Sequence, residues 1–182
     1  QVNEDGSTTL YYETVQGQGF VEYVISAYSD VEEAYSRVGE TTDINQDSYT
    51  DNVRNANLEQ IRYLVTADFG EERRPFGYIR TIYLTSTLNN DNTVSLSWTS
   101  MGSSTPSGSE NKPYKIYRKL KRQDTDWQFL AEQTQRTYTD NLPAICSDSV
   151  LYKIELENDN NCVSRSNQVL HVIGDSQIPD MP

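Results

Sequence analysis

Short segments in which every second residue is apolar run along most of this chain. The alternation is clearest at residues 94–98 (VSLSW), 114–117 (YKIY) and 152–156 (YKIEL). Successive side chains of a strand point to opposite faces of a sheet, so this period predicts strands with one packed face and one solvent-facing face. Runs of turn-forming residues, such as GQG at 17–19 and NNDN at 89–92, separate the segments. The pattern therefore predicts short strands joined by turns.

The strand segments occur twice in the same order. SYTDN at 48–52 returns as TYTDN at 137–141, and the same offset of 89 residues places Tyr63 on Tyr152. Segments 8–14, 22–29 and 36–40 match segments 94–100, 113–120 and 128–132, while the connections between them change length. Loops diverge in length more readily than packed strands. The chain is therefore expected to contain two copies of one module.

Residue usage and spacing favour an all-β fold for each copy. The chain has 13 tyrosines against 4 phenylalanines, with many Thr, Val and Ile, which suit half-buried strands. Residues 31–38 (VEEAYSRV) resemble a helical turn, but their counterpart in the second copy contains strand-formers, so we predict a strand there. Six or seven short strands per copy, without a long helical pattern, predict an antiparallel β-sandwich.

The order of the motifs resembles the fibronectin type III family. VSLSW, YKIYRK, TYTDN, LYKIEL and SRSNQVLHV follow one another in the second copy as strands B to G do in that family. The resemblance implies two tandem immunoglobulin-like (fibronectin type III) antiparallel β-sandwiches, of the kind found in bacterial secreted and cell-surface multi-domain proteins. The residues expected to anchor the two cores are Tyr12, Tyr63, Trp98, Tyr114, Ile116 and Tyr152.

The alignment of the copies predicts three parts of the chain. The first module is expected at 1–87, with few residues available before strand B to form a strand A. The second is expected at 88–175. Residues 176–182 contain two prolines, and are expected to form a linker to a following domain, because proline stiffens such junctions. Neighbouring domains of the same polypeptide are the expected partners.

Charge and length narrow the class of protein. The net charge is −12; the first copy carries 15 acidic residues against 6 arginines, and all lysines lie in the second copy. Nucleic-acid and anionic-membrane binding depend on neutralising phosphate charges, so such an acidic chain is not expected to bind either. No apolar run approaches the ~20 residues of a membrane span, and no insertion is expected. The acidity fits an extracellular or cell-surface location, with the periplasm as an alternative.

The sequence offers no set of residues that meets the needs of an enzyme or a cofactor. His171 is the only histidine and is predicted on an edge strand, where alternation between Leu170 and Val172 turns it outward. Residues 43–47 have the oxygen spacing of a calcium loop, but Ser48 replaces the required glycine. We expect no catalytic, cofactor or metal site, and weak cation binding in the Asn/Asp turns stays open.

The two cysteines leave one question open. Cys146 and Cys162 are both in the second copy, and an even count in an exported protein suggests a disulfide. The two positions flank one strand, whose extended run of eight residues spans about 27 Å. A disulfide requires Cα atoms roughly 4.4–6.8 Å apart, so the pair closes only if the preceding loop folds back along the sheet. Both outcomes stay open.

A basic strip is the candidate binding surface. Lys115, Tyr117, Lys119 and Lys121 alternate with inward residues of one strand and are expected to share its outer face. Such a face suits an acidic glycan or protein, whereas lysines on an exposed strand face also discourage edge pairing. The expected function is a non-catalytic spacer in a larger secreted or surface-exposed bacterial protein. The alternatives are a protein- or carbohydrate-binding adhesion module and an accessory segment of a polysaccharide-degrading enzyme.

Overall fold

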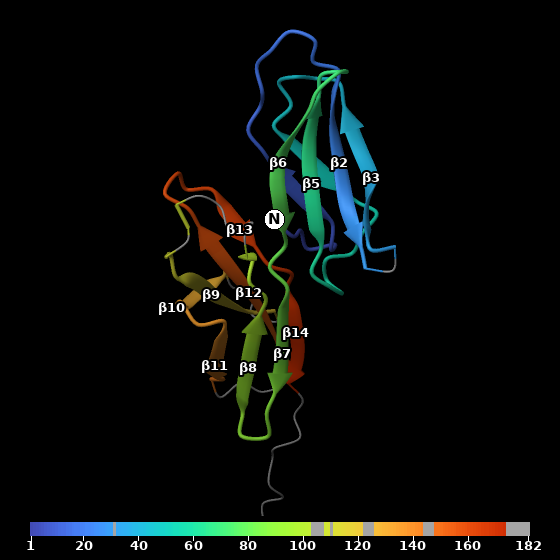
Figure 1. Cartoon of the computed structure of the whole chain (residues 1–182). Coiled ribbons are helices and arrows are strands. Elements are labelled where there is room, and N and C mark those ends of the chain that lie inside the picture. Colours follow the sequence, from blue (N-terminus) through green and yellow to red (C-terminus); the bar gives the residue numbers. More distant parts are fainter. Residues whose placement is uncertain (31, 103–107, 110, 122–125, 144–147, 174–182) are drawn as a thin grey trace, which may run out of the picture.

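A computed structural model describes residues 1–30, 32–102, 108–109, 111–121, 126–143 and 148–173 of the chain. The described residues form antiparallel β-sheets, and no α-helix occurs among them. Two bodies follow one another along the chain, with blue to green strands in one and yellow-green to red strands in the other (Figure 1). The all-β prediction is confirmed.

The first body packs a short sheet against a longer one. Its short sheet pairs β1 (Thr8–Tyr11) with β4 (Ser48–Asp51). Its longer sheet has the order β3-β2-β5-β6. These strands are β2 (Glu22–Ser29), β3 (Ala34–Thr41), β5 (Arg62–Asp68) and β6 (Arg73–Arg80). The strand predicted at 31–38 thus begins at Ala34, after a turn at residues 32–33, and continues to Thr41.

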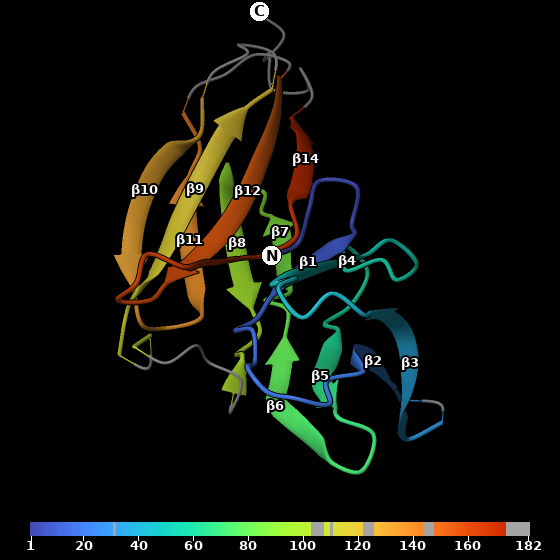
Figure 2. The same cartoon turned by 90° about the horizontal axis from the view of Figure 1, so that it is seen from above.

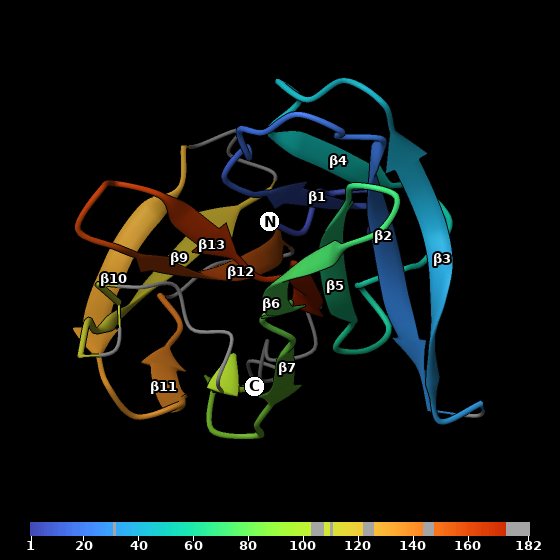
Figure 3. The same ribbon diagram turned by 45° about the horizontal axis from the view of Figure 1, so that its top comes forward.

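The second body repeats this arrangement with two more strands. Its first sheet has the order β11-β8-β7, and its second has the order β10-β9-β12-β13, with β14 also paired to β12. The bounds of the first sheet are β7 (Leu84–Leu88), β8 (Thr93–Trp98) and β11 (Thr137–Asn141). Those of the second are β9 (Tyr114–Leu120), β10 (Gln128–Gln133), β12 (Asp148–Glu157), β13 (Val163–Arg165) and β14 (Val169–Ile173). Figures 2 and 3 show the sheets of both bodies from other sides.

The boundary between the modules lies earlier than the predicted 87/88. β7 pairs with β8, and Ile82 and Leu84 are buried in the second core. The last strand of the first module is β6, which ends at Arg80, before the predicted boundary. The predicted linker at 176–182 lies outside the described residues.

Strand A is nearly absent from the first module. In the second module, β7 pairs with β8. At the equivalent position of the first module there is an isolated bridge between Val2 and Thr8. The order of strands is otherwise the same in the two bodies. β1 and β4 of the first correspond to β8 and β11 of the second (strands B and E), and β3, β2, β5 and β6 correspond to β10, β9, β12 and β13 with β14 (strands C′, C, F and G). This is the arrangement of an immunoglobulin-like sandwich.

The repeated YTDN motif has the same structural role in both modules. Each motif lies on the strand paired with strand B, so Tyr49 faces Leu10 and Tyr138 faces Leu96. The aspartate of each motif is buried and accepts a hydrogen bond from a buried tyrosine of strand F. The oxygen–oxygen distance is 2.9 Å from Tyr63 to Asp51 and 2.7 Å from Tyr152 to Asp140. A buried carboxylate requires such partners, which explains why the pentad recurs.

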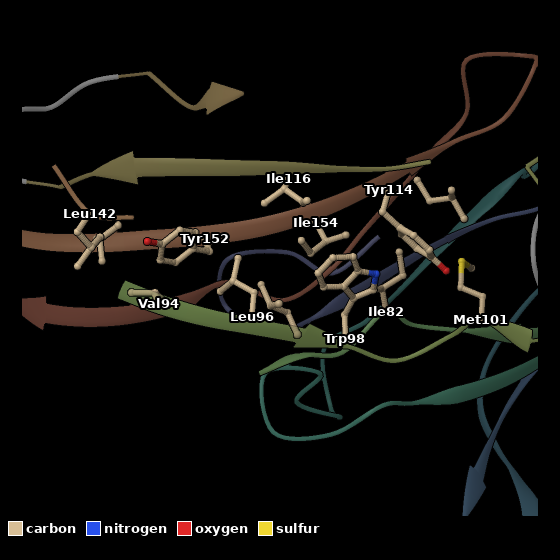
Figure 4. Packing of buried hydrophobic residues seen from close by; sticks show 13 residues of the cluster. Ile82, Val94, Leu96, Trp98, Met101, Tyr114, Ile116, Leu142, Tyr152 and Ile154 are labelled. Carbon is tan, nitrogen blue, oxygen red and sulfur yellow. The ribbon is translucent and has the colours of Figure 1, made fainter. Parts of the chain in front are cut away.

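Each module has its own hydrophobic core. Tyr63, Tyr152 and Ile116 are fully buried, and Trp98 and Tyr114 are nearly so. Figure 4 shows the second core, in which Trp98 lies beside Tyr114 at one end and Tyr152 lies at the other. Tyr12, the counterpart of Trp98, is only half-buried. Its ring centroid is 5.2 Å from that of Tyr23, just as the rings of Trp98 and Tyr114 are 5.6 Å apart.

Candidate functional site

The junction between the modules is held by side-chain hydrogen bonds. The side-chain amide of Gln60, in the first module, lies within hydrogen-bond distance of three oxygens. They are Thr81 O at 2.7 Å, Thr99 Oγ1 at 2.8 Å and Ser100 O at 3.0 Å. An amide nitrogen has two N–H groups, so these are shared among the three acceptors. Gln60 thus connects the first module, the connecting segment and the second module. Sequence reasoning did not identify it, because nothing in the sequence places a loop glutamine at a junction.

The chain on either side of the junction is also fixed. Two hydrogen bonds between Ile61 and Thr81 close the connecting segment onto the first module. The N–H of Ile61 donates to Thr81 Oγ1 at 2.9 Å, and the N–H of Thr81 donates to the carbonyl of Ile61 at 3.0 Å. The N–H of Val2, which is buried, donates to the carbonyl of Arg165 in the second module at 3.0 Å. In Figure 1 the N-terminal end lies at the level where the two bodies meet. The modules therefore contact each other at two separate places.

The predicted basic strip is on the outer face of the second module, but one of its three lysines is neutralised. Lys115 pairs with Glu157, while Lys119 is half-buried and Lys121 is exposed. Tyr117 lies beside Phe129, with ring centroids 5.8 Å apart and Phe129 half exposed. The strip is therefore a mixed ionic and aromatic surface. It is not a continuous basic patch.

A lysine fills the centre of this aromatic surface. The Nζ atom of Lys153 lies 4.9 Å from the ring centroid of Tyr117 and 4.8 Å from that of Trp127. It also pairs with Glu155 at 2.8 Å, and its side chain is only 11% exposed. Cation–π contacts of this kind hold the rings in place. The aromatic faces around Lys153 are consequently occupied by the chain itself.

Arg118 of the same basic run points inward. Its Nη1 donates to Asp140 Oδ2 at 2.8 Å, and its side chain is 10% exposed. Its Nη2 donates to Gln128 at 3.0 Å. Alternation along the strand did contain this signal, because Arg118 shares the parity of the core residues Tyr114 and Ile116. The ion pair makes Arg118 part of the second core.

The prediction that His171 faces outward is wrong. On β14 it is Leu170 and Val172 that are exposed, while His171 is half-buried with its Nε2 2.7 Å from Ser86 Oγ on β7. Alternation predicted the wrong face because this edge strand exposes the apolar side chains of Leu170 and Val172 to solvent. His171 instead connects β14 of one sheet with β7 of the other.

We expect the stability of the second module to decrease as the pH falls through the range where His171 gains a proton. Burial lowers the pKa of His171 below its usual value of 6.5. The folded chain thus binds this proton less tightly than the unfolded chain, so acidification below about 6.5 favours unfolding and the effect is absent above it. Urea unfolding at pH 7.5 and pH 5.0 measures the difference. In His171→Gln, which keeps a polar group near Ser86, the pH dependence is expected to be smaller; an unchanged dependence contradicts the assignment.

The other features singled out in the sequence are the two cysteines and the calcium-like loop at 43–47, and the part of the chain that the structure describes forms no site from them. Cys146 lies outside the described residues, and Cys162 is exposed in the turn between β12 and β13, so the disulfide stays a prediction. Asp43 Oδ1 accepts the backbone N–H of Asn45 at 2.9 Å, as in an ordinary Asx turn. Among the described residues, no group of three or more His, Cys, Asp or Glu is placed to hold a metal ion. In the same part of the chain, no helix is long and apolar enough to cross a membrane.

The first module carries a second aromatic surface, which sequence reasoning missed. On the outer face of the β3-β2-β5-β6 sheet, the ring centroids of Tyr28 and Tyr35 are 5.1 Å apart, and those of Tyr35 and Tyr78 are 5.5 Å apart. The guanidinium carbon of Arg62 lies 4.5 Å from the ring centroid of Tyr28. Arg80 lies directly opposite Arg62 on the neighbouring strand. These residues come from four strands, so only the sheet register brings them together. We call them the tyrosine–arginine face.

Comparison with known proteins gives partial matches. No protein-family model and no curated protein matches the sequence. The fibronectin type III domain of human fibronectin type III domain containing protein 3 is 20% identical, over 56% of this chain and 92% of that chain, with a TM-score of 0.41. The FN1–FN3 domains of chicken CNTN1 are 12% identical over 94% of this chain, with a TM-score of 0.38. Pectate lyase PelI from Erwinia chrysanthemi, solved with tetragalacturonic acid, is 18% identical over 50% of this chain, with a TM-score of 0.36.

The chain spans 27% of the length of the pectate lyase and 61% of the CNTN1 segment. The order and pairing of the strands define the fold, which is two immunoglobulin-like antiparallel β-sandwiches in tandem.

Proposed function

We propose that this chain is a non-catalytic structural segment that holds neighbouring domains of a larger secreted or surface-exposed bacterial protein at a set distance. The observation that carries the proposal is the junction, where Gln60 and Val2 connect the two modules at separate places. Two contacts that are apart in space restrict rotation and bending more than one flexible linker does. The periplasm is the alternative location.

The fold supports such a role because each module has a separate core. Each core contains a buried tyrosine–aspartate hydrogen bond, between β5 and β4 in the first module and between β12 and β11 in the second. Domain interfaces within a chain usually permit relative motion unless they are large and apolar. The polar contacts of Gln60 are therefore the feature that distinguishes a spacer from two freely hinged domains.

Replacing Gln60 by alanine is expected to loosen the angle between the modules while leaving both folded. The substitution removes the donor to Thr99 and Ser100, and the acceptors gain water as their partner. Residual dipolar couplings of the full chain provide the measurement. The wild type is expected to fit one alignment tensor for both modules, and Gln60→Ala to require two. Gln18→Ala, in an exposed loop of the first module, is the control and keeps one tensor.

The outcome against the spacer function is equally definite. If the wild-type modules already require two unrelated tensors, the junction does not fix their orientation. In that case the contacts of Gln60 do not restrict the chain in solution.

A binding function is the second candidate, and a specific observation favours it. Both modules carry exposed aromatic side chains on the outer face of the longer sheet: Tyr78 is 52% exposed in the first and Phe129 is 50% exposed in the second. Tyrosine and arginine dominate the energetics of many binding surfaces. We infer that a protein- or carbohydrate-binding adhesion module, or an accessory segment of a polysaccharide-degrading enzyme, is the next best account of the chain.

A further inference from the structure

The tyrosine–arginine face combines fixed rings with unbalanced positive charge. Tyr35 lies half-buried between Tyr28 and Tyr78, and its ring is 27° from parallel with that of Tyr78. This packing fixes the orientation of the Tyr78 ring, although 52% of that residue is exposed. A rigid, exposed aromatic side chain presents contact area at a low cost in conformational entropy. The face is therefore built before any ligand arrives.

The arginines of this face are not fully neutralised by the chain. Arg62 and Arg80 are directly opposite on adjacent strands, and like charges at such positions repel each other. Arg62 pairs with Asp30 at 2.7 Å, but Asp30 is 74% exposed. Arg80 makes no ion pair with any described residue, and its Nε is buried without a hydrogen-bond partner. The first copy has 15 acidic residues, yet the positive charge of these arginines is not fully paired. This unpaired charge suits an anionic group of a ligand.

The hydroxyl of Tyr35 stays protonated under ordinary conditions. Burial raises the pKa of Tyr35, and the neighbouring Tyr78 raises it further. Protonated phenols donate hydrogen bonds and accept them, as sugar hydroxyls do. The face thus offers ring faces, hydroxyls and guanidinium groups within one cluster.

We propose that the tyrosine–arginine face binds an acidic oligosaccharide. The apolar C–H face of a sugar ring packs on the exposed ring of Tyr78, and a uronate carboxylate accepts hydrogen bonds from Arg80 and Arg62. Guanidinium groups match carboxylates with two parallel bonds, which favours this anion over a simple point charge. The proposal rests on the binding function given above as the second candidate, and it names the surface and the ligand class. It is independent of the spacer function.

The surroundings of the face favour a small ligand over a folded protein. Arg37, on the same side of the sheet, is neutralised by Glu22 and Glu40, so the cationic part ends there. A stable protein interface covers roughly 800 Å² per partner and has an apolar centre. The face has instead a few rings flanked by ion pairs, which fits a chain of sugars lying across the strands.

Titration of the full chain with tetragalacturonate, followed by NMR chemical shifts and calorimetry, tests the proposal. A neutral tetrasaccharide and an acidic tetrapeptide serve as comparison probes. We expect tetragalacturonate to bind with shifts centred on Tyr28, Tyr35 and Tyr78, and to bind at least tenfold more weakly to Tyr78→Ala and to Arg80→Gln. Tyr11→Ala and Arg74→Gln, which alter exposed residues away from the face, are the matched controls and bind as the wild type does.

Each other outcome overturns the proposal in a recognisable way. Binding of the peptide but not the sugar indicates a protein partner, and binding of the neutral sugar alone removes the role of the arginines. Binding that Trp127→Ala abolishes and Tyr78→Ala preserves places the site on the second module. In these three cases a binding function survives. No binding of any probe removes both the proposal and the binding function, whereas the dipolar couplings continue to decide the spacer function alone.

Discussion

Replacing Asp140 by alanine is expected to destabilise the second module by about 3–5 kcal/mol, the usual cost of removing one partner of a buried ion pair. The carboxylate of Asp140 accepts bonds from Arg118 at 2.8 Å and from Tyr152 at 2.7 Å. Its removal leaves the guanidinium of Arg118, only 10% exposed, without an anion. Asp140→Asn is expected to retain much of this cost, because it restores a hydrogen-bond acceptor for Tyr152 but no charge.

Tryptophan fluorescence during urea unfolding measures this effect in the second module alone, because both tryptophans, Trp98 and Trp127, belong to it. The matched control is Asp51→Ala in the first module, followed by circular dichroism. Asp51 accepts hydrogen bonds from Tyr63 and from the backbone N–H groups of Val53 and Arg54, but the guanidinium Nη1 of Arg54 is 3.7 Å away. The loss of Asp51 is therefore expected to cost about 1–3 kcal/mol. Equal costs for the two alanine variants would show that the charge of Arg118 contributes little.

Replacing Trp98 by alanine is expected to destabilise the second module by a similar amount, about 3–5 kcal/mol. Trp98 is 4% exposed and packs edge-on against Tyr114, so its loss leaves a cavity at the end of the core nearest the first module (Figure 4). Trp98→Phe is expected to cost less. Its ring refills part of the space, and the indole N–H, which is buried without a partner, is removed.

The equivalent substitution in the first module shows how much the corresponding ring contributes to the first core. Tyr12→Ala is expected to cost less than Trp98→Ala, because Tyr12 is half-buried and lies just beyond the end of β1. Thermal unfolding followed by circular dichroism compares the two. A cost for Tyr12→Ala as large as that for Trp98→Ala would mean that this half-exposed ring supports the first core as fully as a buried one.

The fold was predictable because its signals are local. Alternation marked β8, β9 and β12, and the repeated YTDN motif aligned the buried pairs Tyr63–Asp51 and Tyr152–Asp140. Both patterns depend on the period of a strand and on the need of a buried carboxylate for a partner. Such requirements act on each copy separately, so comparing the copies revealed them.

The candidate surfaces were much less predictable. The basic strip was placed on the correct strand, yet Lys115 is neutralised by Glu157, which lies on β12. The buried ion pair of Arg118 with Asp140 was not identified, although the alternation of Arg118 is that of the core. His171 was assigned to the wrong face because its neighbours are apolar and still exposed. In each case the deciding contact comes from a neighbouring strand.

The sequence by itself determined the two all-β modules, their strand order and most of their buried anchors, because strand period and core burial are properties of short segments. Only the tertiary structure decided that β7 belongs to the second module, that Gln60 connects the two, and that Tyr28, Tyr35, Tyr78, Arg62 and Arg80 share one face. These features depend on pairing between strands that are distant in the chain. The register of such pairing is set by the packing of the whole sandwich.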